Sequence, residues 1–216
     1  MRMKHMTTRT FLARLGALAV ALALASAPAW PQATPGGPAE PPTAAPPAAG
    51  SRPTLVPNAG DPVDVDEVTL PAKPVAMLSG SATWDEGFDK LKAAFGRIET
   101  ELGRAGITPA GRPIAVFVQT DDNGFKFDAM IPVDRAPPDR PTLGGDVRFG
   151  TTPSGRALRF VHKGPYDDID STYETVTAYL DAKDIEVKDS FVEEYVTDLT
   201  SADDASLEIN IFALPK

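Results

Sequence analysis

The chain has 216 residues, a formal net charge of −9 and no cysteine. The lack of cysteine excludes disulfides, thiolate metal ligands and thiol catalysis. Residues 61–216 carry 16 lysines and arginines against 29 aspartates and glutamates, and so acidic a body repels the phosphates of nucleic acids. The composition therefore predicts a protein without a nucleic-acid partner, and no metal or other cofactor is expected.

The first 29 residues have the composition of a signal peptide. Basic residues precede an unbroken small or apolar run from Leu15 to Ala27, and Ala27-Pro28-Ala29 supplies a small-x-small cleavage pattern. The run has 13 residues, fewer than the roughly 20 that a membrane-spanning helix requires. We therefore expect a periplasmic or secreted protein with no stable membrane insertion after signal cleavage, rather than a membrane-anchored one.

The next segment, residues 30–62, is rich in proline and alanine. Residues 28–62 contain 11 of the 22 prolines. Such a stretch buries too little apolar surface to offset the entropy of ordering, so it is predicted to be a disordered linker. The folded part is then one domain over residues 63–216.

Two apolar stripes at helical spacing lie in this folded part. The positions of the first are Trp84, Phe88, Leu91, Phe95, Ile98 and Leu102, and those of the second are Ile169, Tyr173, Val176 and Leu180. A capping box of Thr83 and Glu86 is expected to begin the first helix, and Gly106 to end it. The acidic pair Asp167 and Asp168 suits the N-terminus of the second helix.

Short alternating segments between these stripes predict strands. They are residues 63–78 with a break near Pro71–Pro74, 113–120, 125–131, 157–162, 191–197 and 207–212. The order strand–helix–strand–strand occurs twice, over about 63–135 and 145–216, and each half is too small to bury its own apolar face. We therefore expect an α+β fold in which a duplicated strand–helix–strand–strand unit forms one antiparallel sheet. Both helices should lie on one face of that sheet, and a central groove on the other.

The strand over 191–197 carries two adjacent acids. Residues two apart in a strand share a face, so Phe191, Glu193 and Tyr195 form one row, and Glu194 lies in the other row between two valines. Because valines suit the face that packs on helices, the Phe–Glu–Tyr row is expected to face the groove. Glu194 interrupts the valine row, so the sequence leaves open which glutamate faces the groove. A carboxylate among aromatic rings has a raised pKa and attracts lipophilic cations.

The last third of the chain holds an ordered set of segments. They are Gly155-Arg-Ala-Leu-Arg-Phe160, His162-Lys-Gly-Pro-Tyr166, the Tyr173–Leu180 helix, Glu193-Glu-Tyr195 with Asp198, and Leu207-Glu-Ile209. This set resembles the GyrI-like, or AraC-type, effector-binding domain, with good coverage of about 150–216 and weaker coverage of 63–135. The resemblance implies a central groove in which an acidic residue of a Glu-x-Tyr strand, ringed by aromatics, binds cationic lipophilic compounds. Where the family usually has a DNA-binding partner domain, we expect the signal and linker here.

We accordingly expect an exported protein that binds lipophilic or cationic organic compounds. The candidate ligand-binding residues are Glu193, Tyr195, Phe191, Tyr166, Phe160, His162 and Trp84. Trp84 and Tyr173 also fit core positions of their helices, and a single histidine on a strand also fits a structural role. One alternative is a structural or protein-interaction module with a degenerate pocket. Another, implied by some relatives of the fold, is a hydrolase in which the groove glutamate is a general base, with His162 or Tyr195 as the acid.

Overall fold

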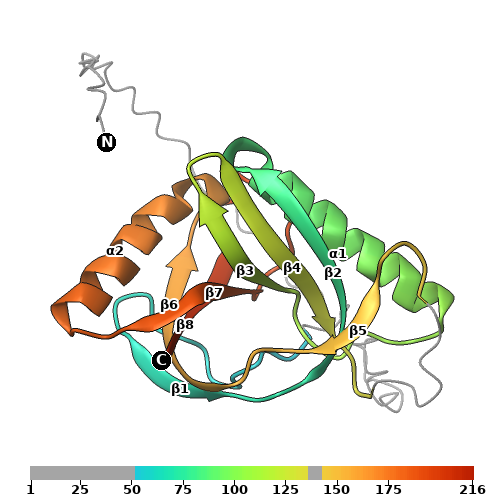
Figure 1. Cartoon of the computed structure of the whole chain (residues 1–216), viewed down its shortest axis with the longest axis horizontal. Coiled ribbons are helices and arrows are strands. Elements are labelled where there is room, and N and C mark those ends of the chain that lie inside the picture. Colours follow the sequence, from blue (N-terminus) through green and yellow to red (C-terminus); the bar gives the residue numbers. More distant parts are fainter. Residues whose placement is uncertain (1–51, 136–142) are drawn as a thin grey trace, which may run out of the picture. The chain divides into compact units, whose positions relative to one another are not determined.

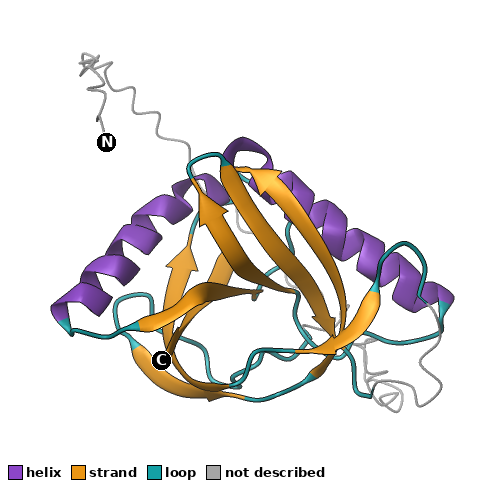
Figure 2. Ribbon diagram, viewed as in Figure 1, coloured by secondary structure: helices purple, strands orange, loops and turns teal. Residues whose placement is uncertain are grey.

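The computed structural model describes residues 52–135 and 143–216, and the predicted signal peptide and most of the predicted linker lie outside these ranges. Eight strands of the described residues form one antiparallel sheet in the order β1-β6-β8-β7-β3-β4-β2-β5. Two helices pack on this sheet, one beside each half (Figures 1 and 2). The predicted α+β class is confirmed. None of the described helices is long and apolar enough to cross a membrane.

The elements follow the predicted periodicity closely. The strands are β1 (Asp66–Leu70), β2 (Pro74–Thr83), β3 (Ile114–Asp121), β4 (Gly124–Pro132), β5 (Arg148–Thr151), β6 (Gly155–Lys163), β7 (Val187–Tyr195) and β8 (Glu208–Pro215). The helices are α1 (Gly87–Arg104) and α2 (Ile169–Ala182), preceded by the 3₁₀ turns η1 (Trp84–Glu86) and η2 (Tyr166–Asp168). Only β5 has no counterpart among the predicted strands, because four residues are too few to show an alternating pattern.

The two halves of the chain have the same order of elements, β1-β2-α1-β3-β4 and β5-β6-α2-β7-β8. Their third strands, β3 and β7, pair at the centre of the sheet, with Ala115 directly opposite Glu193. The first strand of each half pairs with the second strand of the other half, β1 with β6 and β5 with β2. Because each half completes the sheet of the other, the halves share one core.

The start of α1 differs from the expectation, whereas its end agrees with it. Thr83 Oγ1 lies 3.2 Å from the Glu86 carboxylate and caps no backbone N–H, so the predicted capping box is wrong. The chain makes a 3₁₀ turn at Trp84 before the helix begins, and this leaves the indole 52% exposed instead of in the core. At the other end, Gly106 has a φ of +68°, the left-handed conformation that ends many helices.

Both faces of the sheet are covered. On one face the helices bury their apolar stripes, including Phe95 of α1 and Val176 of α2. On the other face a second cluster comprises Leu55, Leu70, Val75, Met77, Ile114, Val116, Met130, Ala157, Val192, Phe212 and Leu214. This cluster joins strands from both ends of the sheet, which therefore curls around it, and Figure 1 shows β1 and β5 curving away from the helices.

Residues 52–60, here called the strap, cross this second face. Leu55 is only 5% exposed, its N–H donates to Glu194 Oε1 over 2.5 Å, and Arg112 N–H donates to Pro53 O over 3.2 Å. The prediction that the disordered linker extends to residue 62 is thus wrong for its last part. A single leucine among prolines gives too weak a periodic signal to reveal such packing.

The strap also occupies the face on which the groove is predicted, and that prediction of its position is wrong. The pocket instead opens on the helical face, between the N-terminal ends of the two helices. Helix α1 packs on β2 and β4 of the first half, and α2 packs on β6 of the second half. The central strands β3 and β7 line the pocket between the two helices.

Candidate functional site

The pocket lies above β3 and β7 and has a volume of about 800 Å³. Its lining comes from both halves of the domain: Trp84, Asp85, Gly87, Phe117, Thr120, Phe125, Tyr166, Asp167, Ile169, Asp170, Tyr173, Phe191 and Glu193. Aromatic and acidic side chains dominate this set, and no lysine or arginine occurs among these thirteen residues. The pocket lining is therefore mostly aromatic, and its ionisable side chains are carboxylates and tyrosines.

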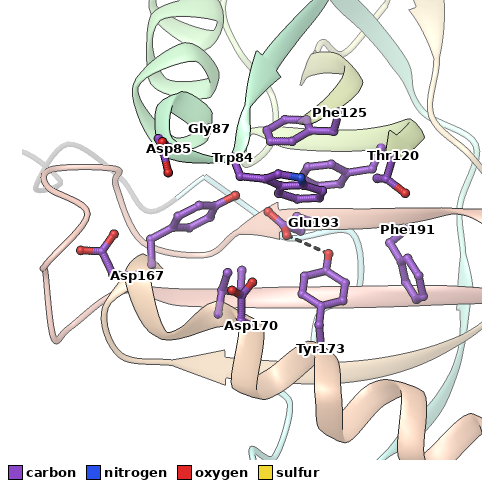
Figure 3. Close-up of a pocket in the computed structure, with 13 residues that line it drawn as sticks. Trp84, Asp85, Gly87, Thr120, Phe125, Asp167, Asp170, Tyr173, Phe191 and Glu193 are labelled. Atoms are coloured by element: carbon purple, nitrogen blue, oxygen red, sulfur yellow. Dashed lines mark hydrogen bonds between the residues drawn. The ribbon is translucent and has the colours of Figure 1, made fainter. Parts of the chain in front are cut away.

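Glu193 provides the carboxylate at the base of the pocket (Figure 3). Its side chain is 1% exposed, and both of its oxygens accept hydrogen bonds from tyrosines. Tyr173 Oη donates to Oε1 over 2.8 Å, and Tyr195 Oη donates to Oε2 over 2.6 Å. Two phenols thus fix the orientation of a single buried carboxylate. The residue opposite it on β3 is Ala115, which adds no second acid.

The environment of Glu193 changes its acidity. Burial raises the pKa of this carboxyl group to about 7, although the hydrogen bonds from Tyr195 and Tyr173 oppose the rise. Burial and the charge of Glu193 raise the pKa of both tyrosines well above 10, so they stay hydrogen-bond donors. Near neutral pH the carboxyl group is poised between its two forms. A positive charge placed in the pocket would favour the ionised form.

Aromatic rings surround this carboxylate on two sides. Figure 3 shows Trp84 and Phe125 on one side of Glu193, and Tyr173 and Phe191 on the other. The ring centroids of Trp84 and Phe125 are 5.2 Å apart, and those of Tyr173 and Phe191 are 5.4 Å apart. The indole Nε1–H of Trp84 donates to a backbone carbonyl oxygen over 3.0 Å, which fixes this half-exposed ring at the pocket.

Three aspartates add charge to the lining of the pocket. Asp85 comes from η1 and Asp167 from η2, and Asp170 lies in the first turn of α2. All three are exposed and belong to the pocket lining. Acidic residues favour helix N-termini in general, but here the two helix starts converge on one cavity. The charged groups that line this cavity are therefore all acidic.

The structure brings four of the seven candidate residues to the pocket: Glu193, Phe191, Tyr166 and Trp84. A fifth, Tyr195, is completely buried beside the carboxylate, where its ring packs edge-on against Phe95 with centroids 5.4 Å apart. The choice between the two acids is also decided. Glu193 faces the pocket, and Glu194 faces the strap.

Phe160 and His162 do not line the pocket. Phe160 is 4% exposed and packs edge-on against Tyr179 of α2. His162 is 3% exposed, with Nδ1 2.8 Å from Thr172 Oγ1 and Nε2 3.0 Å from the carbonyl oxygen of Pro165. These contacts connect β6 to the start of α2. His162 is therefore not placed to act as an acid partner for Glu193.

Several residues of the pocket do not appear among the candidates. Phe117 pairs directly with Phe191 across the two central strands, and its ring lies 5.0 Å from that of Phe125. Applying the two-residue rule to β3 as well as β7 would have placed Phe117 on the same face as Glu193. Phe125 lies on β4, where the same rule puts it on one face with Phe127, whereas the three aspartates lie in 3₁₀ turns and in the first turn of α2 and have no such signal.

The chain belongs to the GyrI-like small molecule binding domain family, whose model matches residues 64–213. The resemblance seen in the sequence is thereby confirmed, and the chain carries a small-molecule-binding domain. Comparison with curated protein sequences gives no significant match.

Solved structures agree with this fold. The crystal structure of the EcmrR C-terminal domain is 17% identical with a TM-score of 0.59, and the alignment covers 71% of this chain and 97% of that domain. In the cryo-EM structure of an EcmrR–DNA complex, EcmrR is 17% identical with a TM-score of 0.60, over 71% of this chain but only 57% of EcmrR. An uncharacterized conserved protein from Listeria innocua is 12% identical with a TM-score of 0.53, over 76% of this chain and 94% of that protein. At such identities the likeness concerns the fold alone.

Proposed function

We propose that this protein is exported and that its pocket binds lipophilic organic cations, with Glu193 as the counter-charge. The observation that carries the proposal is one carboxylate, 1% exposed, in an aromatic pocket whose lining has no basic side chain. An ionised carboxylate without a cationic partner is costly to bury. Without a ligand, Glu193 avoids part of this cost because its raised pKa favours the neutral form. A bound cation would offset the same cost directly.

The surrounding rings define the kind of cation. A cation over the face of an aromatic ring gains about 0.5–2 kcal/mol for each ring. Trp84 and Phe125 offer such rings on one side of the carboxylate, and Phe117 also lines the pocket. These surfaces have few directional hydrogen-bond donors, so they accept different shapes. The acidic lining attracts cations and repels anions. The proposed ligands are therefore bulky or flat aromatic cations.

Calorimetric titration with two ions of equal shape tests the charge requirement. Tetraphenylphosphonium should bind, whereas its anionic counterpart tetraphenylborate should not. The Glu193→Gln variant keeps the shape and removes the charge, and it should lose about 2–4 kcal/mol of affinity for the cation, which is about 30- to 1,000-fold. The exposed Glu174→Gln on α2, outside the pocket lining, serves as the matched control and should bind like the wild type.

Two results of this titration would contradict the proposal. If Glu193→Gln bound tetraphenylphosphonium as tightly as the wild type, the carboxylate would not be the counter-charge. If the wild type bound neither that cation nor a series of other aromatic cations, a structural module with a degenerate pocket would explain the chain better.

Export has its own test. The proposal depends on the basic start, the 13-residue apolar run and the Ala27-Pro28-Ala29 pattern of the leader. N-terminal sequencing of the native protein should find a chain that begins close to residue 30. An intact Met1 on the native protein would contradict export by signal cleavage.

A further inference from the structure

The strap lies outside the part of the chain that matches the family, because the match begins at residue 64. It nevertheless packs on the second face, where Leu55 joins the apolar cluster. We propose that this face is a second binding site, a groove for a peptide segment that bends at residues 55–58, and that the strap occupies it as a ligand of its own chain. This proposal is independent of the cation pocket.

The contacts of the strap are those of a bound peptide. The groove satisfies the peptide backbone: Glu194 accepts the N–H of Leu55 over 2.5 Å, and the guanidinium of Arg159 donates to the carbonyl oxygens of Asn58 and Ala59 over 2.5 and 3.3 Å. One side chain, that of Leu55, supplies the apolar anchor. Backbone hydrogen bonds combined with a buried side-chain anchor are also the means by which many domains bind peptides.

The polar groups at the centre of this groove fit the same role. Glu194 is fully buried and Asn210 is 3% exposed, and Asn210 Nδ2 donates to Glu194 Oε2 over 2.9 Å. The remaining oxygen of the carboxylate receives the peptide N–H. Asn210 Oδ1 is buried without a hydrogen-bond partner in the described structure. The strands of the sheet supply no hydrogen-bond donor to Glu194 Oε1 or Asn210 Oδ1 in the described structure. Two free acceptor oxygens suit a groove that binds the N–H groups of a peptide.

The strap is built as a separable segment. No residue of the strap belongs to a described strand of the sheet, and the residues that connect it to β1 are mostly exposed, with Val63 at 89%. Pro53 and Pro57 flank the anchor, and their fixed φ angles lower the entropy lost when this bent segment docks. The groove therefore fits an uncharged, proline-bounded segment with a central leucine.

Peptide binding in trans to the full chain tests this inference. A fluorescent peptide of residues 52–60 should not bind the wild type, whose groove is filled, nor the control Val63→Asp, which alters only an exposed valine. It should bind the Leu55→Asp chain saturably, because the strap of this variant is released. The same peptide carrying Leu55→Asp should bind none of the three proteins.

Hydrogen exchange reports the state of the groove in each protein. In the Leu55→Asp chain, the amides of residue 55 and Arg112, whose hydrogen bonds are lost when the strap is released, should exchange at least tenfold faster, while those of β3, β7 and β8 stay protected. Release of the strap without any binding of the peptide would overturn the proposal. If both Leu55→Asp and the milder Leu55→Ala lost protection throughout the sheet, the strap would be an inseparable part of the core, and the proposal would also be wrong.

Discussion

Replacing Glu193 by glutamine should stabilise the empty protein at high pH, although the same change removes the proposed counter-charge. The folded-state pKa of Glu193 is raised from 4.5 to about 7 because the group is buried. Between these two pH values the folded protein binds a proton that the unfolded chain releases. The contribution of this group to stability is therefore fully present below about pH 4.5 and is lost as the pH rises through about 7.

The size of the effect follows from the shift of the pKa. A shift of about 2.5 pKa units, at 1.36 kcal/mol for each unit, corresponds to a loss of about 3 kcal/mol between acidic and alkaline conditions. Glutamine resembles the protonated acid in shape and cannot ionise. It can accept a hydrogen bond from one tyrosine and donate one to the other. The Glu193→Gln protein should thus avoid most of this loss.

Urea unfolding at about pH 4.5 and about pH 8.5 measures the difference. The two proteins should have similar free energies of unfolding at the lower pH, and at the higher pH the variant should be more stable by about 2–3 kcal/mol. Glu174→Gln, on the exposed side of α2, should follow the wild type at both values. If the difference between wild type and Glu193→Gln were the same at both pH values, Glu193 would not titrate in the folded protein as argued.

Three further substitutions separate binding from stability. Trp84→Ala should lower the affinity for tetraphenylphosphonium by about 0.5–2 kcal/mol through a lost cation–π contact. Its free energy of unfolding in urea should change little, since the ring is 52% exposed. An unchanged affinity would exclude this ring from the site. Tyr173→Phe removes one hydrogen-bond donor to the Glu193 carboxylate and should raise its pKa. The pH at which the affinity for the cation rises should therefore move upward from about 7. Calorimetry over a pH series would show no such movement if that hydrogen bond were unimportant. His162→Ala should cost about 2–4 kcal/mol of stability, because it removes a buried ring and its bond to Thr172. Its cation affinity should stay unchanged, and a fall like that of Glu193→Gln would place His162 in the binding site.

The sequence alone predicted the local structure because local structure depends on neighbours along the chain. The four–three spacing of apolar residues specified both helices, and alternation located all strands except β5. Gly106 marked the end of α1, since glycine takes its φ of +68° without strain. The Phe191, Glu193, Tyr195 row likewise followed from the two-residue period of a strand. Together with the family resemblance, this row pointed to the carboxylate that lies in the pocket.

Only the tertiary structure decided which face of the sheet each row meets. The strand pattern predicts Val192 against the helices, but this residue packs on the second face with Leu55 of the strap. Both faces of the sheet are buried, and an apolar row fits either one. Glu194 is tolerated on that second face because Leu55, which is 139 residues away in sequence, supplies a backbone donor to it. Partners so distant leave no periodic trace in either segment. The position of the pocket between the helices, and the strap on the opposite face, therefore depended on contacts that form only when the chain folds.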